Sequence, residues 1–347
     1  MASNNTRVIQ YDVMRVVAAL AVVWLHTSAQ RFAICYPSVE WEARNIYDSL
    51  VRWAVPIFVM ISGALYLDPH RRIDIKHLYA KSITRIVLIF IFWSIVYCSV
   101  YVGVGKLNLT GMVVEIAQGP FHFWFLKMLI GLYIIVPILR VVVIKKKLEL
   151  YFICLSLVTS FLIPTLFHLL GYLNDAVRDS VERYYDVFGI KIAIGYVSYF
   201  VLGHYLANYN VTKVVKKVFY ILGILSVLSV IILTHFASIY VGTPYTAFYS
   251  NFNILTLFEA IAIFILIRDI QIIPKYHASL ISISKLSLGI YILHPLVMII
   301  LFHFGNIDSA SLNPVYFIPL YAFMVFIISY CISLILTKIP IIKKVVM

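Results

Sequence analysis

Ten apolar runs, each long enough to cross a lipid bilayer, dominate the sequence and leave few folds open to it. A bilayer core of about 30 Å needs a helix of about 20 mostly apolar residues, and backbone groups in lipid must be satisfied within the segment. Of 347 residues, 63% are hydrophobic and 12% are charged, which excludes an ordinary soluble domain. We therefore predict an all-α polytopic membrane protein. The runs lie near residues 10–29, 47–67, 82–103, 121–139, 150–170, 190–208, 218–236, 251–267, 281–303 and 315–337.

The distribution of lysine and arginine predicts the orientation of these spans. Most of the 28 basic residues fall on one side of the predicted spans, and basic loops are retained in the cytoplasm. Both termini are therefore expected in the cytoplasm. The net charge of +13 comes from these short clusters, which disfavours a nucleic-acid-binding face. The predicted outer side carries fewer basic residues, namely Arg31, Arg44, Lys106, Arg178 and Arg183.

We interpret the whole chain, 1–347, as a single transmembrane domain. Its four cysteines are scattered without the spacing of a disulfide framework or a zinc site, so no metal is expected. The first apolar run carries internal charges and no cleavage site follows it. We expect it to remain as the first membrane helix.

The first run contains three titratable residues, Asp12, Arg15 and His26. Such groups cost about 2.5–3.5 kcal/mol for each central charge and indicate function by default. Eleven helical residues return to within about 20° of one direction, so Arg15 and His26 share a stripe, and Asp12 can pair with Arg15. Alternatively, Asp12 and Arg15 reach the inner interface and His26 caps the outer end. The stripe between them is lined by small residues and predicts a narrow groove: Ala18, Ala19 and Val22.

The second span combines a cation with a helix-breaking residue. Pro56 removes the hydrogen bond to the carbonyl of Arg52, four residues earlier, so we expect a kink beside Arg52. A kinked wall with a cation could shape a site in the outer leaflet, and the alternative is an interfacial arginine above a packing kink. Further along, Ser62-Gly63 favours close packing against another helix.

The densest basic cluster runs from His70 to Arg85 on the predicted cytoplasmic side. Retention of basic loops in the cytoplasm explains most of this cluster. Arg85, one turn beyond Lys81, could also bind a phosphate group, because a guanidinium donates two parallel hydrogen bonds to phosphate.

Titratable and aromatic residues also occur in the later spans. Lys127 lies about two turns into the fourth span, after Trp124 in an aromatic interfacial belt, and could form a structural or a catalytic ion pair with Glu259. In the ninth span, His294 follows Tyr291 by three residues and precedes a proline. A hydrogen-bonded core histidine is the competing interpretation of His294.

In this order, these residues resemble the membrane acyltransferase-3 family, which transfers acyl groups, usually acetyl from acetyl-CoA, to sugars of surface polysaccharides and related envelope acceptors. The resemblance covers nearly the whole chain, and its most specific part is Arg15-x10-His26 with Asp12 ahead, which is similar to the family's Arg/Lys-x10-His signature. By this resemblance, the ten spans are expected to form a complete family membrane domain, without the extra hydrolase-like domain of some members. Supporting segments are Val55-Pro56-Ile57-Phe58 with Ser62-Gly63, Lys81 to Arg85, Phe123-Trp124-Phe125 with Leu132-Tyr133, Tyr199-Phe200 with Gly203, and Tyr291 with His294-Pro295.

The resemblance implies a bacterial inner-membrane sugar O-acetyltransferase that uses acetyl-CoA as co-substrate. In this hypothesis, acetyl-CoA binds at the cytoplasmic mouth near Arg15 and Arg85, and its pantetheine arm reaches His26 through the groove. His26 then accepts a proton from the acceptor hydroxyl or carries the acetyl group, and Arg52 or Lys127 stabilises the oxyanion. The expected partners are acyl-CoA, membrane lipid and a carbohydrate that is free or polyprenyl-linked, without nucleic acid. The expected catalytic residues are Asp12, Arg15 and His26, and the expected substrate-binding residues are Arg52, Lys81, Arg85, Trp124, Lys127, Glu259, Tyr291 and His294.

A transporter or flippase for a lipid-linked sugar or a small metabolite is the main alternative, because ten helices with intramembrane charges also suit alternating access. The sequence does not contain paired broken helices in matching halves, which disfavours that alternative. A sensor or scaffold without chemistry would require the charges of the first span to be dispensable.

Overall fold

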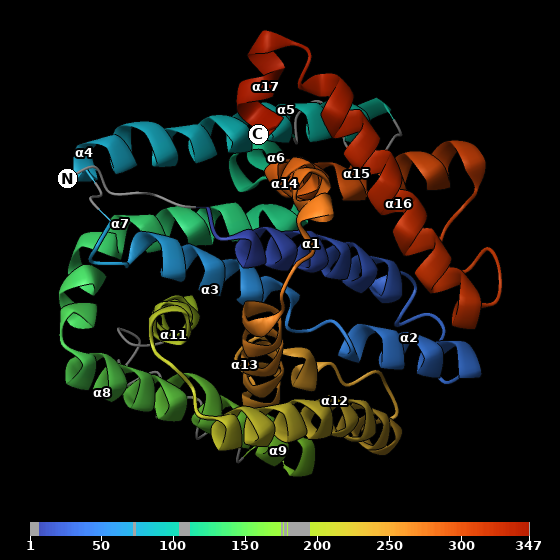
Figure 1. Ribbon diagram of the computed structural model, residues 1–347. Helices are drawn as coiled ribbons and strands as arrows, with labels where there is room; N and C mark the ends of the chain where they lie inside the picture. The colour runs from blue at the N-terminus through green and yellow to red at the C-terminus, as the bar shows by residue number, and fades with distance from the viewer. Residues whose placement is uncertain are drawn as a thin grey trace.

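The computed structural model describes residues 7–71, 74–103, 112–174, 176, 179 and 195–346. Within these residues the protein is helical and contains no strand, which confirms the predicted fold class (Figure 1). The predicted outer residues Lys106, Arg178 and Arg183 lie outside the described ranges. The α-helices are α1 (Ile9–Ala29), α2 (Val39–Ser49), α3 (Ala54–Tyr66), α4 (Ile75–His77), α5 (Thr84–Gly103), α6 (Met112–Gln118), α7 (Trp124–Ile144), α8 (Lys146–Ser156), α9 (Ile163–Leu173), α11 (Tyr196–Asn208), α12 (Lys213–Val241), α13 (Ile254–Asp269), α14 (His277–Lys285), α15 (Ser287–Gly305), α16 (Pro314–Leu336) and α17 (Pro340–Val346).

Nine helical segments of the described chain are long and apolar enough to span a membrane. They match nine of the ten predicted runs. The remaining run, 190–208, corresponds to α11, which has 13 residues, and residues 190–194 lie outside the described part. In two spans, a π-helical segment joins two α-helices into one continuous helix. These segments are Leu78–Ile83, between α4 and α5, and Leu157–Leu162, between α8 and α9.

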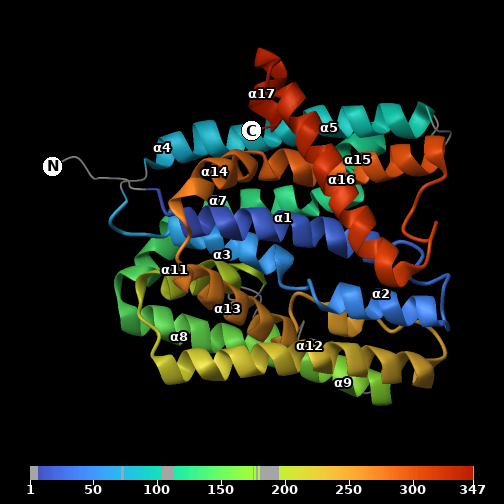
Figure 2. The ribbon, with the colours of Figure 1, turned by 45° about the vertical axis from the view of Figure 1, so that its right-hand side comes forward.

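Helix α1 lies at the centre of the bundle in both ribbon views (Figures 1 and 2). It packs against α2 and α3 on one side and against α14, α15 and α16 on the other. Its small side chains Ala18, Ala19 and Val22 are buried in these contacts. The central position explains how a helix with three titratable residues avoids lipid.

The predicted kink in the second span is present. Helix α2 ends at Ser49 and α3 begins at Ala54, so the chain breaks around Arg52. Pro56 lies in the first turn of α3, where its missing N–H group costs nothing, and the carbonyl that it cannot bond is that of Arg52.

Helices α3 and α11 cross at very short range, and Figure 1 shows α11 almost end-on below α3. A Cβ atom added at Gly63 would lie 1.7 Å from the carbonyl oxygen of Phe200, and one added at Gly203 would lie 2.1 Å from that of Met60. Only glycine fits at these two positions. The predicted close packing at Ser62-Gly63 is therefore confirmed.

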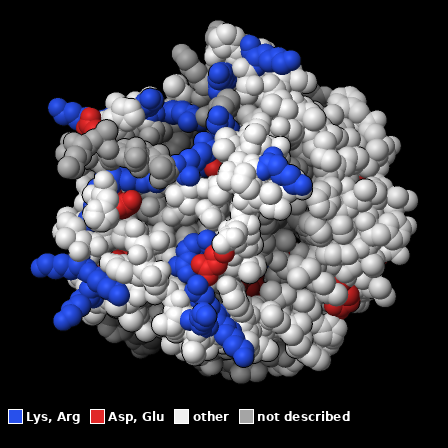
Figure 3. Space-filling view, viewed as in Figure 1, with Lys and Arg blue, Asp and Glu red and all other residues white. Residues whose placement is uncertain are grey.

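The starts of α1, α4 and α12 lie at one end of the bundle in Figure 2. We call this the inner end, following the predicted orientation, and the opposite end, with the α1–α2 and α15–α16 loops, the outer end. Basic side chains gather over the left and centre of the face in Figure 3, and its right-hand third is nearly free of them. This uneven distribution agrees with the charge bias of the sequence.

Candidate active site

A buried carboxylate organises the inner end of α1. Asp12 is 1% exposed, and its two oxygens accept hydrogen bonds from Arg7 at 2.7 and 2.6 Å and one from Ser284 at 2.6 Å. The predicted pair with Arg15 is present but looser, at 3.7 Å. Arg7 and Ser284 thus satisfy Asp12. The guanidinium of Arg15 makes no hydrogen bond to the described residues, so its donors are available to a ligand.

Arg15 lines an inner cavity of about 450 Å³ between α1, α3, α7 and α15. This volume lies within the usual range of small-molecule sites, about 300–1,000 Å³. The inner part of its wall carries Arg15, Arg71 and Tyr66, and its deep part carries Phe125 and Tyr291. A cationic mouth that leads to an apolar interior suits a ligand with a phosphate head and a long arm.

A second predicted cation, Arg85, is exposed and does not line the cavity. Tyr66 and Tyr133 line the cavity with ring centroids 4.5 Å apart, and both Arg15 and Arg85 lie within electrostatic range of these two tyrosines. The loop after α3 is held by Arg140, which donates to the carbonyl oxygens of Tyr66 at 3.0 Å and Arg71 at 2.9 Å. Exposed Lys81, in the first π-helical turn, does not line the cavity.

His26 lines a separate outer cavity of about 320 Å³, together with Phe121, Pro295 and Phe302. Its ring centroid is 5.4 Å from that of Phe121 and 5.1 Å from that of His294. Among the described residues, His26 has no hydrogen-bond partner. Both imidazole nitrogens are therefore available for proton transfer or for attack on an acyl group.

The two cavities share no lining residue, so the predicted continuous groove is wrong. Ala18, Ala19 and Val22 line neither cavity, because their small side chains let neighbouring helices pack directly on α1. Tyr291 and His294 on α15 lie between the cavities, and the Tyr291 hydroxyl donates to the carbonyl oxygen of His122. We call Tyr291, His294 and His122 the barrier.

The barrier residues are buried, with His122 1% and His294 0% exposed. The ring centroids of these two histidines are 5.9 Å apart. His294 Nδ1 lies 3.2 Å from the carbonyl oxygen of Ile290, whereas its Nε2 has no partner among the described side chains. His294 is thus half satisfied. The described residues contain no group of three His, Cys, Asp or Glu side chains that could hold a metal ion.

The predicted substrate residue Arg52 lies outside the His26 cavity. Its guanidinium pairs with Asp48, donates to the carbonyl oxygen of Tyr249 at 3.2 Å and lies 3.9 Å above the ring of Tyr249. Arg52 and Asp48 line an outer polar pocket of about 360 Å³, and Ala29 is common to this pocket and the His26 cavity.

The predicted pair between Lys127 and Glu259 is wrong. Lys127 is on the exposed side of α7, where its Nζ donates to the carbonyl oxygen of Gln118 at 3.0 Å. Glu259 is 1% exposed, lines a pocket of about 330 Å³ between α12 and α13, and has no partner on either oxygen among the described residues. Trp124, 38% exposed, stacks on Tyr196 and lines none of these cavities.

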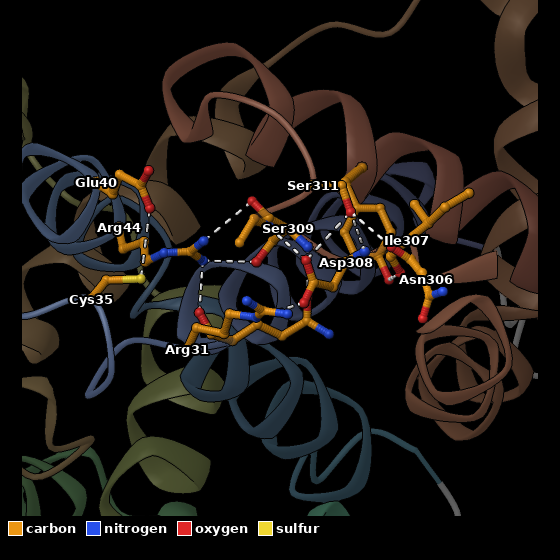
Figure 4. A network of polar contacts seen from close by, with 12 residues as sticks. Arg31, Cys35, Glu40, Arg44, Asn306, Ile307, Asp308, Ser309 and Ser311 are labelled. Atoms are coloured by element: carbon orange, nitrogen blue, oxygen red, sulfur yellow. Dashed lines mark hydrogen bonds and ion pairs between the residues drawn. The ribbon is translucent and has the colours of Figure 1, made fainter. Parts of the chain in front are cut away.

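A polar network closes the outer end near the His26 cavity (Figure 4). Arg44, fully buried, donates to the carbonyl oxygen of Gln30 at 2.7 Å and to the Ser309 hydroxyl at 2.7 Å and carbonyl at 3.2 Å. Arg31 pairs with Asp308 at 2.7 Å. Because Gln30 lines the cavity, this network fixes its wall by joining the α1–α2 and α15–α16 loops.

Three functional candidates were missed from the sequence: Arg7, Arg71 and His122. His122 stands in an aromatic stretch that is typical of an interfacial belt, and only its burial beside His294 distinguishes it. In the sequence, Arg7 and Arg71 look like the basic residues that flank any membrane span on its cytoplasmic side. Their contacts with Asp12 and with the inner cavity depend on the tertiary fold.

Comparison with known proteins places this geometry in a family. Residues 8–334 match the family model described as an acyltransferase domain. Two relatives from Staphylococcus aureus are named probable poly-beta-1,6-N-acetyl-D-glucosamine export protein. The one from strain MSSA476 is 24% identical over 298 residues and the one from strain Mu50 is 25% identical over 312 residues, each alignment covering 85% of this chain and 81% of the relative. No solved structure matches the chain. Because the family match extends over nearly the whole sequence, the chain belongs to the membrane acyltransferase-3 family.

Proposed function

We propose that this membrane acyltransferase moves an acetyl group from cytoplasmic acetyl-CoA to a hydroxyl of an envelope polysaccharide or lipid-linked sugar on the outer side of the bacterial cytoplasmic membrane. The supporting observation is the position of Arg15 and His26 on one central helix, each open to a different cavity. A donor and an acceptor held on opposite sides of a membrane require such an arrangement. The family membership supports acyl transfer as the reaction.

In this proposal, the inner cavity binds the donor. Arg15, Arg71 and Arg85 supply guanidinium groups for the phosphates, and the cavity of about 450 Å³ accommodates the pantetheine arm. Asp12 is already satisfied by Arg7 and Ser284. Its role is to hold the start of α1 and to orient Arg15 rather than to move a proton.

The thioester must pass the barrier to reach His26. Tyr291 lines the inner cavity, and its hydroxyl bond to the carbonyl of His122 keeps the barrier closed. Rotation of the Tyr291 side chain would leave the buried carbonyl of His122 without its donor, at a cost of about 1–3 kcal/mol, and would also displace the neighbouring rings of Phe125 and His294. Gating motions of this kind occur at rates compatible with turnover.

At the outer cavity, His26 acts as the general base. Its imidazole accepts the proton of the acceptor hydroxyl while the hydroxyl oxygen attacks the thioester carbonyl. The carbon–sulfur bond then breaks, and the sulfur of CoA takes up the proton from His26. General base catalysis of this kind contributes about 10²–10⁴-fold.

A transfer assay tests the proposal directly. Purified protein in lipid nanodiscs receives radiolabelled acetyl-CoA and methyl N-acetyl-β-glucosaminide, and His26→Ala is compared with His303→Ala, an exposed histidine near the outer end of α15. We expect His26→Ala to lose at least 100-fold in rate and His303→Ala to retain it. Arg15→Ala should raise the KM for acetyl-CoA.

An assay in cells tests the same function without the choice of one particular acceptor sugar. Mass spectrometry of envelope glycans should show acetyl esters that disappear in a deletion strain and return with the wild-type gene but not with His26→Ala. Restoration by His26→Ala at normal protein levels would contradict the assignment.

Export of a polysaccharide is the second candidate, favoured by the name of the S. aureus relatives. It predicts movement of a labelled N-acetylglucosamine oligosaccharide across proteoliposomes in the absence of acetyl-CoA. Acetyl transfer without such movement would favour the acyltransferase, and movement without transfer would favour the exporter.

A further inference from the structure

The outer polar pocket differs in composition from the other cavities near the outer end. Most of its lining residues are polar, and they come from α2, the α2–α3 break, α9 and the segment before α13. They are Asp48, Arg52, His168, Thr246, Tyr249 and Ser250. By contrast, the His26 cavity is lined mainly by apolar side chains. A larger share of the lining residues is therefore polar in this pocket than in the His26 cavity.

The Arg52–Asp48 pair gives the pocket a rigid polar wall. Both side chains are largely buried, at 14% and 2% exposed. Tyr249 holds Arg52 further, through its carbonyl oxygen and its ring face. Because the two charges neutralise each other, the wall offers donors and acceptors without a net charge. Such a wall suits an uncharged polar ligand better than a phosphate or a carboxylate.

Two buried nitrogen atoms of the pocket residues have no hydrogen-bond partner among the described residues. They are Nε of Arg52 and Nδ1 of His168. Buried polar atoms are nearly always paired in proteins, and exceptions need an explanation. A ligand with several hydroxyl groups would satisfy both atoms.

The pocket is adjacent to His26. Ala29, three residues after His26 on α1, lines both spaces, and the His26 ring lies within electrostatic range of Arg52. A ligand in the pocket therefore needs to extend past one alanine side chain to present a group to the imidazole.

We propose that the outer polar pocket binds an uncharged sugar ring of the acceptor and directs one of its hydroxyl groups past Ala29 toward His26. This inference rests on the proposed function. The pocket of about 360 Å³ holds a small ligand, and rings with adjacent hydroxyls match the mixture of donors and acceptors on its wall. Arg52 is then a residue that selects the acceptor, not the oxyanion donor expected from the sequence.

Binding can be measured without catalysis. Saturation-transfer NMR on the full-length protein in nanodiscs, without acetyl-CoA, would compare three methyl glycosides: the neutral N-acetyl-β-glucosaminide, the cationic glucosaminide and the anionic glucuronide. We expect the neutral glycoside to bind most tightly. Preference for the glucuronide, or no binding of the neutral glycoside, would overturn the proposal.

Two variants locate the site. Thr246→Trp fills the pocket from an exposed position, and His168→Phe removes a nitrogen atom that has no partner. Each should weaken binding of the neutral glycoside at least tenfold, while His303→Phe, outside the pocket at the same end, should bind normally. Thermal unfolding shows whether each variant is folded. If one variant is misfolded, glycoside binding by the other variant tests the site. Unchanged binding in a folded Thr246→Trp or His168→Phe protein would overturn the assignment.

Steady-state kinetics of acetyl transfer distinguish a failure of this inference from a failure of the proposed function. Both variants should raise the acceptor KM about tenfold and leave the KM for acetyl-CoA unchanged. A wild-type protein that binds the neutral glycoside in this pocket but transfers no acetyl group would contradict the proposed function and leave the sugar site standing.

Discussion

Replacing Gly63 by alanine should destabilise the protein severely, because α3 and α11 have no space for one more methyl group. The new Cβ atom would lie 1.7 Å from the carbonyl oxygen of Phe200, and ordinary contacts begin at 3.4 Å. To remove this clash, the two helices must separate by about 1.5 Å or more, because the clashing atoms belong to the backbone and cannot rotate away as a side chain could. We therefore expect a loss at the upper end of overpacking effects, about 3 kcal/mol.

Thermal unfolding of the detergent-solubilised protein measures this loss. For a chain of this size, about 3 kcal/mol corresponds to a fall of about 5 °C in Tm. Gly203→Ala, with its Cβ 2.1 Å from the carbonyl oxygen of Met60, should act similarly. The double variant should lose less than the sum, because both methyl groups open the same crossing.

Gly131→Ala is the matched control. Gly131 lies in the middle of α7 with nothing within 4 Å of an added Cβ atom, so alanine should keep or raise Tm through its helix propensity, by up to about 1 kcal/mol. If Gly63→Ala unfolds within 1 °C of Gly131→Ala, the described crossing of α3 and α11 is refuted. Because α3 supplies Ser62 and Tyr66 to the inner cavity, the wild-type crossing also shapes that cavity.

Four further substitutions test three separate features. Arg44→Met should lower Tm by several degrees, because it leaves the buried acceptors of Gln30 and Ser309 unpaired. Arg31→Ala should lower Tm as well, because it leaves the buried Asp308 carboxylate without its cation; an unchanged Tm in both variants would argue against the network. Glu259→Leu should raise Tm, since an unpartnered carboxyl is replaced by an apolar side chain in an apolar pocket, and a lower Tm would indicate an undetected partner. Tyr291→Phe removes the bond that closes the barrier and should speed hydrolysis of acetyl-CoA by water about two- to tenfold, measured as free thiol release without acceptor; no change would exclude this bond as the gate.

Local patterns in the sequence predicted several structural features correctly. The apolar runs predicted the spans, Pro56 predicted the break beside Arg52, and Ser62-Gly63 predicted a close helix contact. Each of these depends on the residue itself or on its immediate neighbours. The positions of Arg15 and His26 at opposite ends of α1 follow in the same way from helix geometry.

Contacts between distant segments were beyond the sequence. Ser284 reaches Asp12 across 272 positions, and nothing in a single sequence indicates which helix faces which. For the same reason, the expected ion pair of Lys127 with Glu259 was wrong: the two side chains face different surroundings, one exposed and one buried.

The expected groove along α1 failed for another reason. Small side chains on a helix permit either a channel or close packing, and the pattern is identical in both cases. In α1 the neighbouring helices fill the space beside Ala18 and Ala19. The inner cavity and the His26 cavity consequently end on either side of Tyr291 and His294.

The central claim, transfer of an acetyl group from one side of the membrane to the other through His26, can be tested in sealed proteoliposomes. Labelled acetyl-CoA is placed on the side of the inner end, and the acceptor glycoside is confined to the opposite compartment. We expect labelled acetyl ester on the glycoside while CoA remains in the donor compartment, and no ester with His26→Ala. Label that stays in the donor compartment, or equal labelling by His26→Ala, would contradict the account.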